Sequence, residues 1–227
     1  MKTLSIIIPC FNEQATIHEL LQRVLQVSLP SNWKKEIVVV DDGSQDDTRK
    51  ILDDYKDRLK IIYHTKNQGK GSAVKTGIEN SSGDYILIQD ADLEYNPKEI
   101  PLLINELNKG KADIIYGSRN IHHEKRKGMY IPRVGVWFIT KQFNILYGSK
   151  LTDLWTCYKL FPKKAGHLFV SGRFESELIF STSLVKNNFK IAEVPISHNP
   201  RTIENGKKIK YRDGIIGIWV LFIQRFK

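Results

Sequence analysis

The first half of this 227-residue chain alternates short apolar runs with longer segments whose apolar residues recur at helical spacing. The short runs predict five β-strands, over Leu4–Ile8, Glu36–Val40, Lys60–Tyr63, Tyr85–Gln89 and Ala112–Tyr116. The segments between them predict helices over Glu13–Val27, Asp46–Arg58, Lys70–Asn80 and Pro97–Asn108. Repeated strand–helix units predict an α/β fold, with a Rossmann-like, mostly parallel sheet flanked by helices on both faces.

Beyond residue 118 the pattern is less regular. It predicts helices near Val134–Tyr147 and Phe174–Asn187, a strand or hairpin near Leu154–Phe161 and a strand near Ile191–Ile196. A basic loop and a short apolar segment follow. We therefore expect one domain over residues 1–213 and a separate apolar segment over residues 214–227.

The most informative run is Ile86–Asp92, in which an apolar strand ends in two carboxylates, Asp90 and Asp92. Residues i and i+2 of an extended chain point to the same side, so both carboxylates face one point beyond the strand. Oxygen ligands there suit Mg²⁺ or Mn²⁺, which keep other positions for water and a substrate diphosphate. We predict a divalent metal site at Asp90 and Asp92 with Glu94 as a third ligand. The alternative is an acidic turn ahead of the next helix.

Two further strands end in residues that suit ligand binding, at the sheet edge where α/β proteins bind their ligands. Pro9, Phe11 and Glu13 either hold a base and a ribose, or are core residues and a first-turn carboxylate. Asp42 either accepts from a nucleobase N–H or belongs to an Asp-Gly-Ser turn. The Gly-rich residues 67–72 either bind phosphate through backbone N–H groups or form a simple loop.

Composition narrows the class of protein. Apolar residues make up 41% and charged residues 26%, which excludes a disordered chain. No Gly-x-Gly-x-x-Gly or P-loop motif occurs, which argues against dinucleotide binding and P-loop chemistry. Cys10 and Cys157 lack metal-site spacing and are expected to be free thiols in a reducing, cytoplasmic compartment. The longest late apolar run, Ile215–Ile223, is too short to cross a bilayer, which needs about 20 residues.

Charge is unevenly divided along the chain. Residues 1–118 carry 15 Lys and Arg against 18 Asp and Glu, whereas residues 119–227 carry 20 against 7. The basic half suits anionic lipid headgroups, a phosphorylated acceptor or nucleic acid. We expect no nucleic-acid partner, because the strand-end carboxylates would repel a phosphate backbone unless a metal intervened. Arginine side chains in this half match phosphate oxygens, although each one alone is equally a surface charge.

The ordered set of motifs resembles family 2 glycosyltransferases of GT-A fold. The matching segments are Pro9–Glu13, Val40–Thr48, Asn67–Gly71, Asp90–Glu94 and Gly117–Arg119. Later segments resemble the dolichyl-phosphate mannose and glucose synthase branch: Asp153–Lys159, Glu193–Ile196, and Arg201 with Gly206–Lys208. Phe11 in place of Tyr, Glu94 in place of Gln, and Thr156–Lys159 in place of Ser-Gly-Phe-Arg depart from that branch and leave the sugar open.

The resemblance implies inverting transfer of a hexose, such as mannose or glucose, from a GDP- or UDP-sugar to a polyprenyl phosphate. It places Asp90, Asp92 and Arg119 in catalysis, and Asp90, Asp92 and Glu94 on Mg²⁺ or Mn²⁺. It assigns the nucleotide sugar to Pro9, Phe11, Glu13, Val40, Asp42, Ala91, Arg201 and Lys207. Arg133 would bind the acceptor phosphate.

Two other functions stay open on sequence alone. A transferase of the same fold acting on a saccharide hydroxyl would need a carboxylate base, for which Asp153 and Glu177 are candidates. A non-enzymatic nucleotide-sugar binder is the other alternative. Residues 214–227 are expected either to lie at the cytoplasmic membrane face as an interfacial helix, giving a peripheral membrane contact, or to pack on the core.

Overall fold

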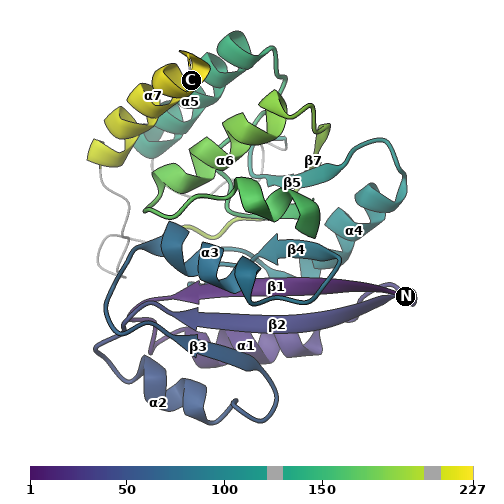
Figure 1. Ribbon diagram of the computed structural model, residues 1–227, viewed down its shortest axis with the longest axis vertical. Helices are drawn as coiled ribbons and strands as arrows, with labels where there is room; N and C mark the ends of the chain where they lie inside the picture. The colour runs from purple at the N-terminus through teal and green to yellow at the C-terminus, as the bar shows by residue number, and fades with distance from the viewer. Residues whose placement is uncertain (122–129, 202–210, 227) are drawn as a thin grey trace.

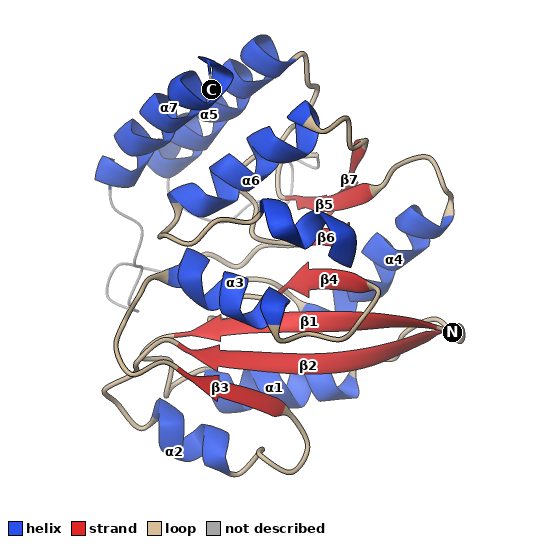
Figure 2. Cartoon of the chain, in the orientation of Figure 1, coloured by secondary structure: helices blue, strands red, loops and turns tan. Residues whose placement is uncertain are grey.

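The structure, a computed structural model, describes residues 1–121, 130–201 and 211–226; the side chains of residues 130–134 and 211–215 lie outside this description. Within these ranges seven strands form one sheet in the order β3-β2-β1-β4-β6-β5-β7 (Figures 1 and 2). The strands are β1 (Lys2–Cys10), β2 (Trp33–Asp41), β3 (Lys60–Tyr63), β4 (Tyr85–Ile88), β5 (Ile114–Ser118), β6 (Lys159–Pro162) and β7 (Ile191–Pro195). All neighbouring strands are parallel except β6, which runs antiparallel to both β4 and β5.

The register of the central strands determines where the site forms. Cys10 at the end of β1 pairs with Asp41 at the end of β2, and Ile7 pairs with Ile88 of β4. The carboxyl ends of β1, β2 and β4 therefore meet at one edge of the sheet. Residues 11–13, 42 and 90–92 leave the sheet at that edge, which is the ligand-binding edge of parallel α/β sheets.

Helices cover both faces of the sheet, with α3 and α6 on the near face and α1 and α4 on the far face in Figure 1. The helices are α1 (Ile17–Gln26), α2 (Thr48–Asp53), α3 (Lys70–Glu79), η1 (Pro97–Glu99), α4 (Ile100–Asn108), α5 (Tyr130–Tyr147), η3 (Lys163–Leu168), α6 (Glu175–Lys186) and α7 (Tyr211–Phe226). The predicted Rossmann-like α/β architecture is confirmed.

Two apolar clusters, one on each face of the sheet, form the core. On one face Leu4, Ile6 and Ile8 of β1 pack against the apolar stripe of α1. On the other face Ile7 of β1 packs with residues of α3, α5, α6 and α7, among them Phe143. Alternate residues of β1 therefore contribute to opposite faces, as the period of two in a strand requires.

The region ahead of β6 differs from the prediction of a strand or hairpin near Leu154–Phe161. The structure has a single strand, β6, which begins only at Lys159. The preceding residues form buried turns whose polar groups bond to other segments: the Asp153 carboxylate accepts from Arg119, and the Cys157 N–H donates to the Tyr95 hydroxyl. These side-chain bonds replace a strand ladder and bring residues 153–157 to the site.

Helix α7 has a buried side and an exposed side. Gly217 and Leu221 are buried against the rest of the protein, whereas Trp219 and Phe222 are 64% and 55% exposed. The boundary expected at residue 213 falls inside this helix, which begins at Tyr211. Among the described residues, none of the helices combines the length and the apolar character that crossing a bilayer requires.

Candidate active site

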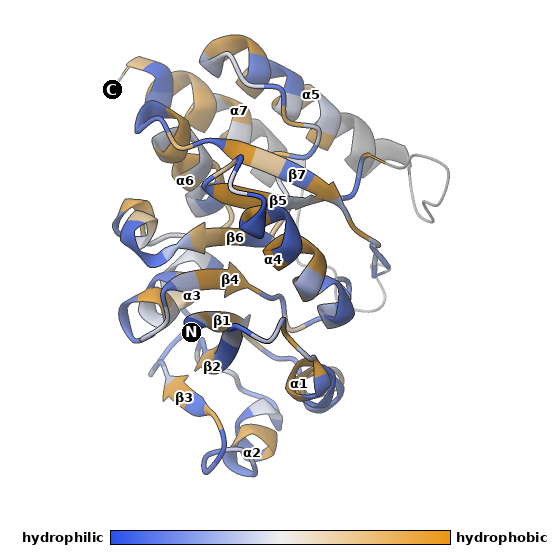
Figure 3. Cartoon of the chain, turned by 90° about the vertical axis from the view of Figure 1, so that its right-hand side faces the viewer, coloured by the Kyte–Doolittle hydropathy of each residue, from blue (hydrophilic) through white to orange (hydrophobic). Residues whose placement is uncertain are grey.

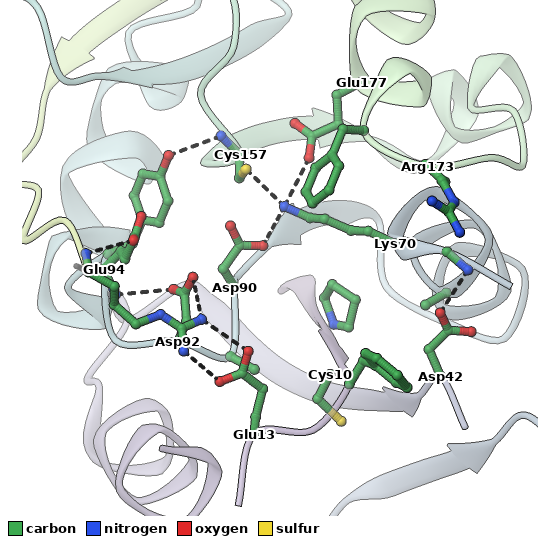
Figure 4. Close-up of a pocket in the computed structure, with 18 of the residues that line it drawn as sticks. Cys10, Glu13, Asp42, Lys70, Asp90, Asp92, Glu94, Cys157, Arg173 and Glu177 are labelled. Carbon is green, nitrogen blue, oxygen red and sulfur yellow. Dashed lines mark hydrogen bonds and ion pairs between the residues drawn. The ribbon is translucent and has the colours of Figure 1, made fainter. Parts of the chain in front are cut away.

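A cavity of about 340 Å³ opens at the carboxyl ends of β1, β2 and β4 (Figure 4). Its volume falls within the range of small-ligand sites. Most of the residues predicted for the site line it: Pro9, Phe11, Glu13, Asp42, Asp90, Ala91, Asp92, Glu94, Arg119 and Arg201. The structure therefore brings together, at one place, side chains that the sequence distributes over nearly 200 positions.

Asp90 and Asp92 lie side by side at the end of β4, as their spacing predicts. Their side chains are only 15% and 19% exposed. Burial, followed by the negative charges of Asp90 and Glu94, raises the pKa of Asp92 to about 6. Two carboxylates that converge in this way repel each other when both are ionised, and a bound divalent cation removes that repulsion.

A buried lysine neutralises the first of these carboxylates. The Lys70 Nζ atom lies 2.6 Å from Asp90 Oδ1, 3.1 Å from Glu177 Oε1 and 2.8 Å from the Cys157 sulfur. Burial alone would lower the pKa of Lys70, but the charges of Asp90 and Glu177 raise it well above its usual range. Lys70 therefore stays protonated inside the cavity.

Arg201 neutralises the second carboxylate. Its guanidinium forms two 3.0 Å bonds to the Glu13 carboxylate, and its Nη2 also lies 2.9 Å from Asp92 Oδ2. The residue is supplied by the segment after β7. Arg201 thus links the end of β1 to the end of β4.

Glu94, predicted as a third metal ligand, contacts that same segment. Its Oε2 lies 3.0 Å from His198 Nε2, and its Oε1 accepts a 2.8 Å hydrogen bond from the Arg201 backbone N–H. These bonds lower the pKa of Glu94 against the opposing effect of burial. In this arrangement Glu94 positions Arg201, and a metal-ligand role for it stays a prediction.

Asp42, predicted to contact the nucleoside, holds the Gly-rich turn. Its Oδ1 accepts from the Gln68 N–H (2.9 Å) and lies 2.7 Å from His64 Nδ1, while its Oδ2 accepts from the Gly69 N–H (2.8 Å). Gly69 has a φ of +96°, and a Cβ there would lie 2.8 Å from the Gly172 carbonyl oxygen. Only glycine fits this turn, which directs Lys70 into the cavity.

Arg119, predicted to act in catalysis, is held by a buried carboxylate. Arg119 Nε and Nη2 donate to the two oxygens of Asp153 at 2.7 and 2.8 Å, and its backbone N–H also donates to Asp153. Burial alone would lower the pKa of Arg119, but the Asp153 charge raises it well above its usual range. Asp153, one of the candidate bases, is thereby committed to positioning Arg119.

The remaining predicted residues have different fates. Val40 is fully buried inside the sheet and does not line the cavity. The backbone of Arg133 lies in α5, but its side chain is outside the described residues, as is all of Lys207.

The sequence reasoning gave no role to several residues that line the cavity, namely Lys70, Tyr95, Trp155, Arg173 and Phe174. Glu177, named only as a base for a hydroxyl acceptor, also lines it. The Gly-rich run of residues 67–72 was the one sequence feature that could have pointed to Lys70.

Residues 5–167 match the family described as "Glycosyl transferase family 2", which covers most of the chain. The chain belongs to glycosyl transferase family 2. The predicted family membership and the prediction of a glycosyltransferase are thereby confirmed.

Three proteins illustrate what this chain is similar to. The dodecaprenyl-phosphate galacturonate synthase of Rhizobium johnstonii is 27% identical over 99% of this chain and 68% of its own length. The dolichol-phosphate mannosyltransferase of Pyrococcus furiosus is 40% identical over 52% of this chain and 33% of its own length. Glucosyl-3-phosphoglycerate synthase from Mycobacterium tuberculosis, solved with UDP, has a TM-score of 0.76 at 17% identity, covering 99% of this chain and 80% of that one. This last likeness concerns the fold alone.

Proposed function

We propose that this glycosyltransferase moves a hexose from a GDP- or UDP-sugar to a polyprenyl phosphate, such as dolichyl or undecaprenyl phosphate, with inversion at the sugar carbon. Family membership supports the reaction type. The names of two similar proteins, a dodecaprenyl-phosphate and a dolichol-phosphate sugar transferase, support the acceptor class. Mg²⁺ or Mn²⁺ is the proposed cofactor.

The proposal of a phosphate acceptor rests on the ion pairs that the carboxylates of the cavity form. Each of the described carboxylates that line the cavity lies within ion-pair distance of a lysine, arginine or histidine: Glu13, Asp42, Asp90, Asp92, Glu94 and Glu177. Burial would raise the pKa of Glu177, but Lys159 and Lys70 lower it to about 2, which makes it a poor base at neutral pH. A hydroxyl acceptor needs such a base, whereas a phosphate acceptor is already an anion.

The donor set at the cavity mouth fits a hard divalent cation that shares its ligands with a substrate. The described residues contain no cluster of three acidic, histidine or cysteine side chains able to hold a metal by themselves. Asp90 and Asp92 supply two adjacent carboxylates, and Mg²⁺ is commonly bound by one or two carboxylates together with substrate phosphates. An ion held there would offset negative charge on the departing diphosphate.

The protein's own side chains would share that task. In the transfer, an oxygen of the lipid phosphate bonds to the sugar's anomeric carbon while the bond from that carbon to the nucleoside diphosphate breaks. Lys70 and Arg201 lie next to the two acids and would neutralise the leaving diphosphate. Arg173 also lines the cavity, and no ion-pair partner of its guanidinium occurs among the described residues. It is free to receive the acceptor phosphate.

A direct test uses the full chain, Mn²⁺, a panel of labelled GDP- and UDP-hexoses and vesicles containing polyprenyl phosphate. We expect a labelled, acid-labile lipid with one of the donors, and none from vesicles that contain the polyprenol without its phosphate. Label appearing only in water-soluble glycans would instead assign a saccharide hydroxyl as the acceptor. Donor binding without transfer to either would indicate a nucleotide-sugar binder.

A lipid acceptor requires contact with a membrane, and helices α5 and α7 offer a surface for it (Figure 3). We propose that the exposed apolar side chains of these helices form a docking face: Trp137, Phe138, Ile145, Ile216, Trp219, Phe222, Ile223 and Phe226. A groove of about 460 Å³ runs between the two helices. Neither residues 130–147 nor residues 214–227 contain Asp or Glu, so the face complements an anionic headgroup layer.

Helix α7 approaches the active-site cavity on its buried side, through Trp155. This side chain lines the cavity, and a Cβ placed on Gly217 of α7 would lie 3.5 Å from its ring. The helix that carries much of the docking face therefore also packs against a residue of the cavity wall. We propose that the membrane contact is peripheral and lies at the cytoplasmic face of the membrane.

Replacing Trp219 and Phe222 together with serine should weaken binding to anionic phospholipid vesicles by roughly tenfold or more, because each buried aromatic contributes about 1.5–3 kcal/mol. Vesicle flotation measures this binding. Leu102→Ser on α4 is the matched control, since Leu102 is also exposed (48%) but lies outside the docking face. Equal loss in the control, or no flotation of the wild type, would contradict the proposal. A dimer that only the double variant dissociates would assign the face to a second copy.

A further inference from the structure

Lys70 occupies an unusual position among charged groups at the floor of the cavity. From Lys159 inward, positive and negative charges alternate: Lys159 Nζ lies 2.8 Å from Glu177 Oε2, Glu177 Oε1 lies 3.1 Å from Lys70, and Lys70 lies 2.6 Å from Asp90. The side chains of Lys159 and Glu177 are 0% and 2% exposed, so this end of the chain of charges is fixed. At the other end Lys70 and Asp90 are each 15% exposed and line the cavity.

The two carboxylates that pair with Lys70 differ in their other cationic partners. Glu177 retains Lys159 on its other oxygen, whereas Asp90 has no cation other than Lys70 among the described ion pairs. If Lys70 leaves Asp90, its ammonium group keeps Glu177 and the Cys157 sulfur as partners. Movement away from Asp90 therefore does not leave a buried ammonium without a counter-charge, which would be costly.

Arg201 repeats this arrangement at Asp92. Its guanidinium keeps both bonds to Glu13 when the 2.9 Å contact to Asp92 is lost. Each acid of the proposed metal site is thus paired with a cation that has a second anionic partner.

We infer that Lys70 is an exchangeable counter-ion, which competes with the divalent metal ion for Asp90 and passes to the donor diphosphate when metal and donor bind together. The inference rests on the proposed metal and donor site. It predicts positive coupling between metal and nucleoside diphosphate, because the diphosphate supplies the displaced ammonium with a new partner. Without nucleotide, Lys70 keeps metal affinity low; with nucleotide, the same charge contributes to binding.

Mn²⁺ binding, measured by the loss of the free-ion electron paramagnetic resonance signal, tests this inference without any turnover. Without nucleotide, Lys70→Met should bind Mn²⁺ roughly tenfold or more tightly than the wild type, because a unit charge a few ångströms away is removed. With saturating GDP or UDP, whichever binds, the variant should gain less Mn²⁺ affinity than the wild type gains. A purely structural role for Lys70 would weaken Mn²⁺ binding or leave it unchanged.

Three further variants separate charge from other effects. Lys75→Gln, on the exposed side of the same helix, should bind Mn²⁺ as the wild type does. Lys70→Arg keeps the charge and should also stay near the wild-type affinity. Lys70→Gln is the second neutral variant, should methionine not be tolerated. Unchanged or weaker Mn²⁺ binding in the neutral variants, or equal tightening in Lys70→Arg, would overturn the inference.

The outcome for Lys70 is distinguishable from the outcome for the proposed reaction. Mn²⁺ binding involves no acceptor. If no labelled lipid forms but Lys70→Met binds Mn²⁺ more tightly than the wild type, the counter-ion role of Lys70 therefore still stands. Conversely, lipid formation by a wild-type enzyme whose Lys70→Met variant binds Mn²⁺ no more tightly would keep the reaction and remove the counter-ion role.

Discussion

Replacing Asp92 with asparagine should reduce sugar transfer by at least about a thousandfold while leaving the fold intact. Asparagine keeps the size of the side chain but removes the charge that a divalent ion and its bound diphosphate require. Radiolabel transfer to polyprenyl phosphate measures the loss. Asp57→Asn, at an exposed position of the same residue type, is the control and should transfer at the wild-type rate.

The same variant should not lose stability in the absence of metal, which distinguishes it from a folding defect. The folded-state pKa of Asp92 is raised from 3.8 to about 6, so the folded protein holds this proton more tightly than the unfolded chain does. In the metal-free wild type, ionisation of Asp92 therefore lowers the free energy of unfolding as the pH rises from 3.8 to about 6. Asp92→Asn has no such group to ionise and does not show this decrease. A lower melting temperature at pH 7 together with lost activity would contradict this explanation.

Replacing Arg119 with methionine should be severe for both stability and activity. The substitution leaves the Asp153 carboxylate, which is 0% exposed, without its bidentate partner. Breaking such a buried pair costs about 3–5 kcal/mol, and urea unfolding measures it. Transfer should fall by at least about a hundredfold, because a fixed cation is lost from the cavity wall.

Two further variants test that explanation. Arg119→Met combined with Asp153→Asn should recover part of the stability and none of the activity, since the unpaired charge is removed but the cation is not restored. Arg23→Met breaks an exposed pair with Glu19 (43% and 54% exposed) and should cost less than about 1 kcal/mol. Full recovery of transfer in the double variant would assign Arg119 a structural role alone.

Local patterns predicted the parts of the site that a single strand positions. The five strands of the first half appear where apolar runs predict them, and Asp90 and Asp92 lie together because alternation along β4 determines their direction. The convergence of Glu13, Asp42 and Asp92 followed from parallel strand topology, since strand ends share one edge of the sheet.

Contacts between distant segments were not predictable from such patterns. Glu177 and Lys70 are 107 positions apart in sequence, and nothing in the helical spacing of either segment indicates that they meet. Two residues apart on a helix, Glu175 and Glu177 face different sides of it. Glu177 alone reaches the cavity, since the start of α6 packs so closely on Gly71 that a Cβ there would lie 2.2 Å from Ser176 Oγ.

The sequence also did not indicate which groups each carboxylate would bond to. Asp42 was predicted to contact a nucleoside and is found bonded to the turn of residues 68–69, and Glu94 is bonded to the segment that carries Arg201. Both outcomes depend on which cationic or N–H groups the fold brings within reach, and composition does not specify this.

The most direct test of the account is a crystal structure of the full chain with Mn²⁺ and a nucleoside diphosphate. The account predicts an anomalous Mn²⁺ peak between the Asp90 and Asp92 carboxylates and the diphosphate, with Lys70 and Arg201 turned from the acids toward the phosphate oxygens. A diphosphate bound elsewhere, or acids still paired with Lys70 and Arg201 and no metal between them, would contradict it.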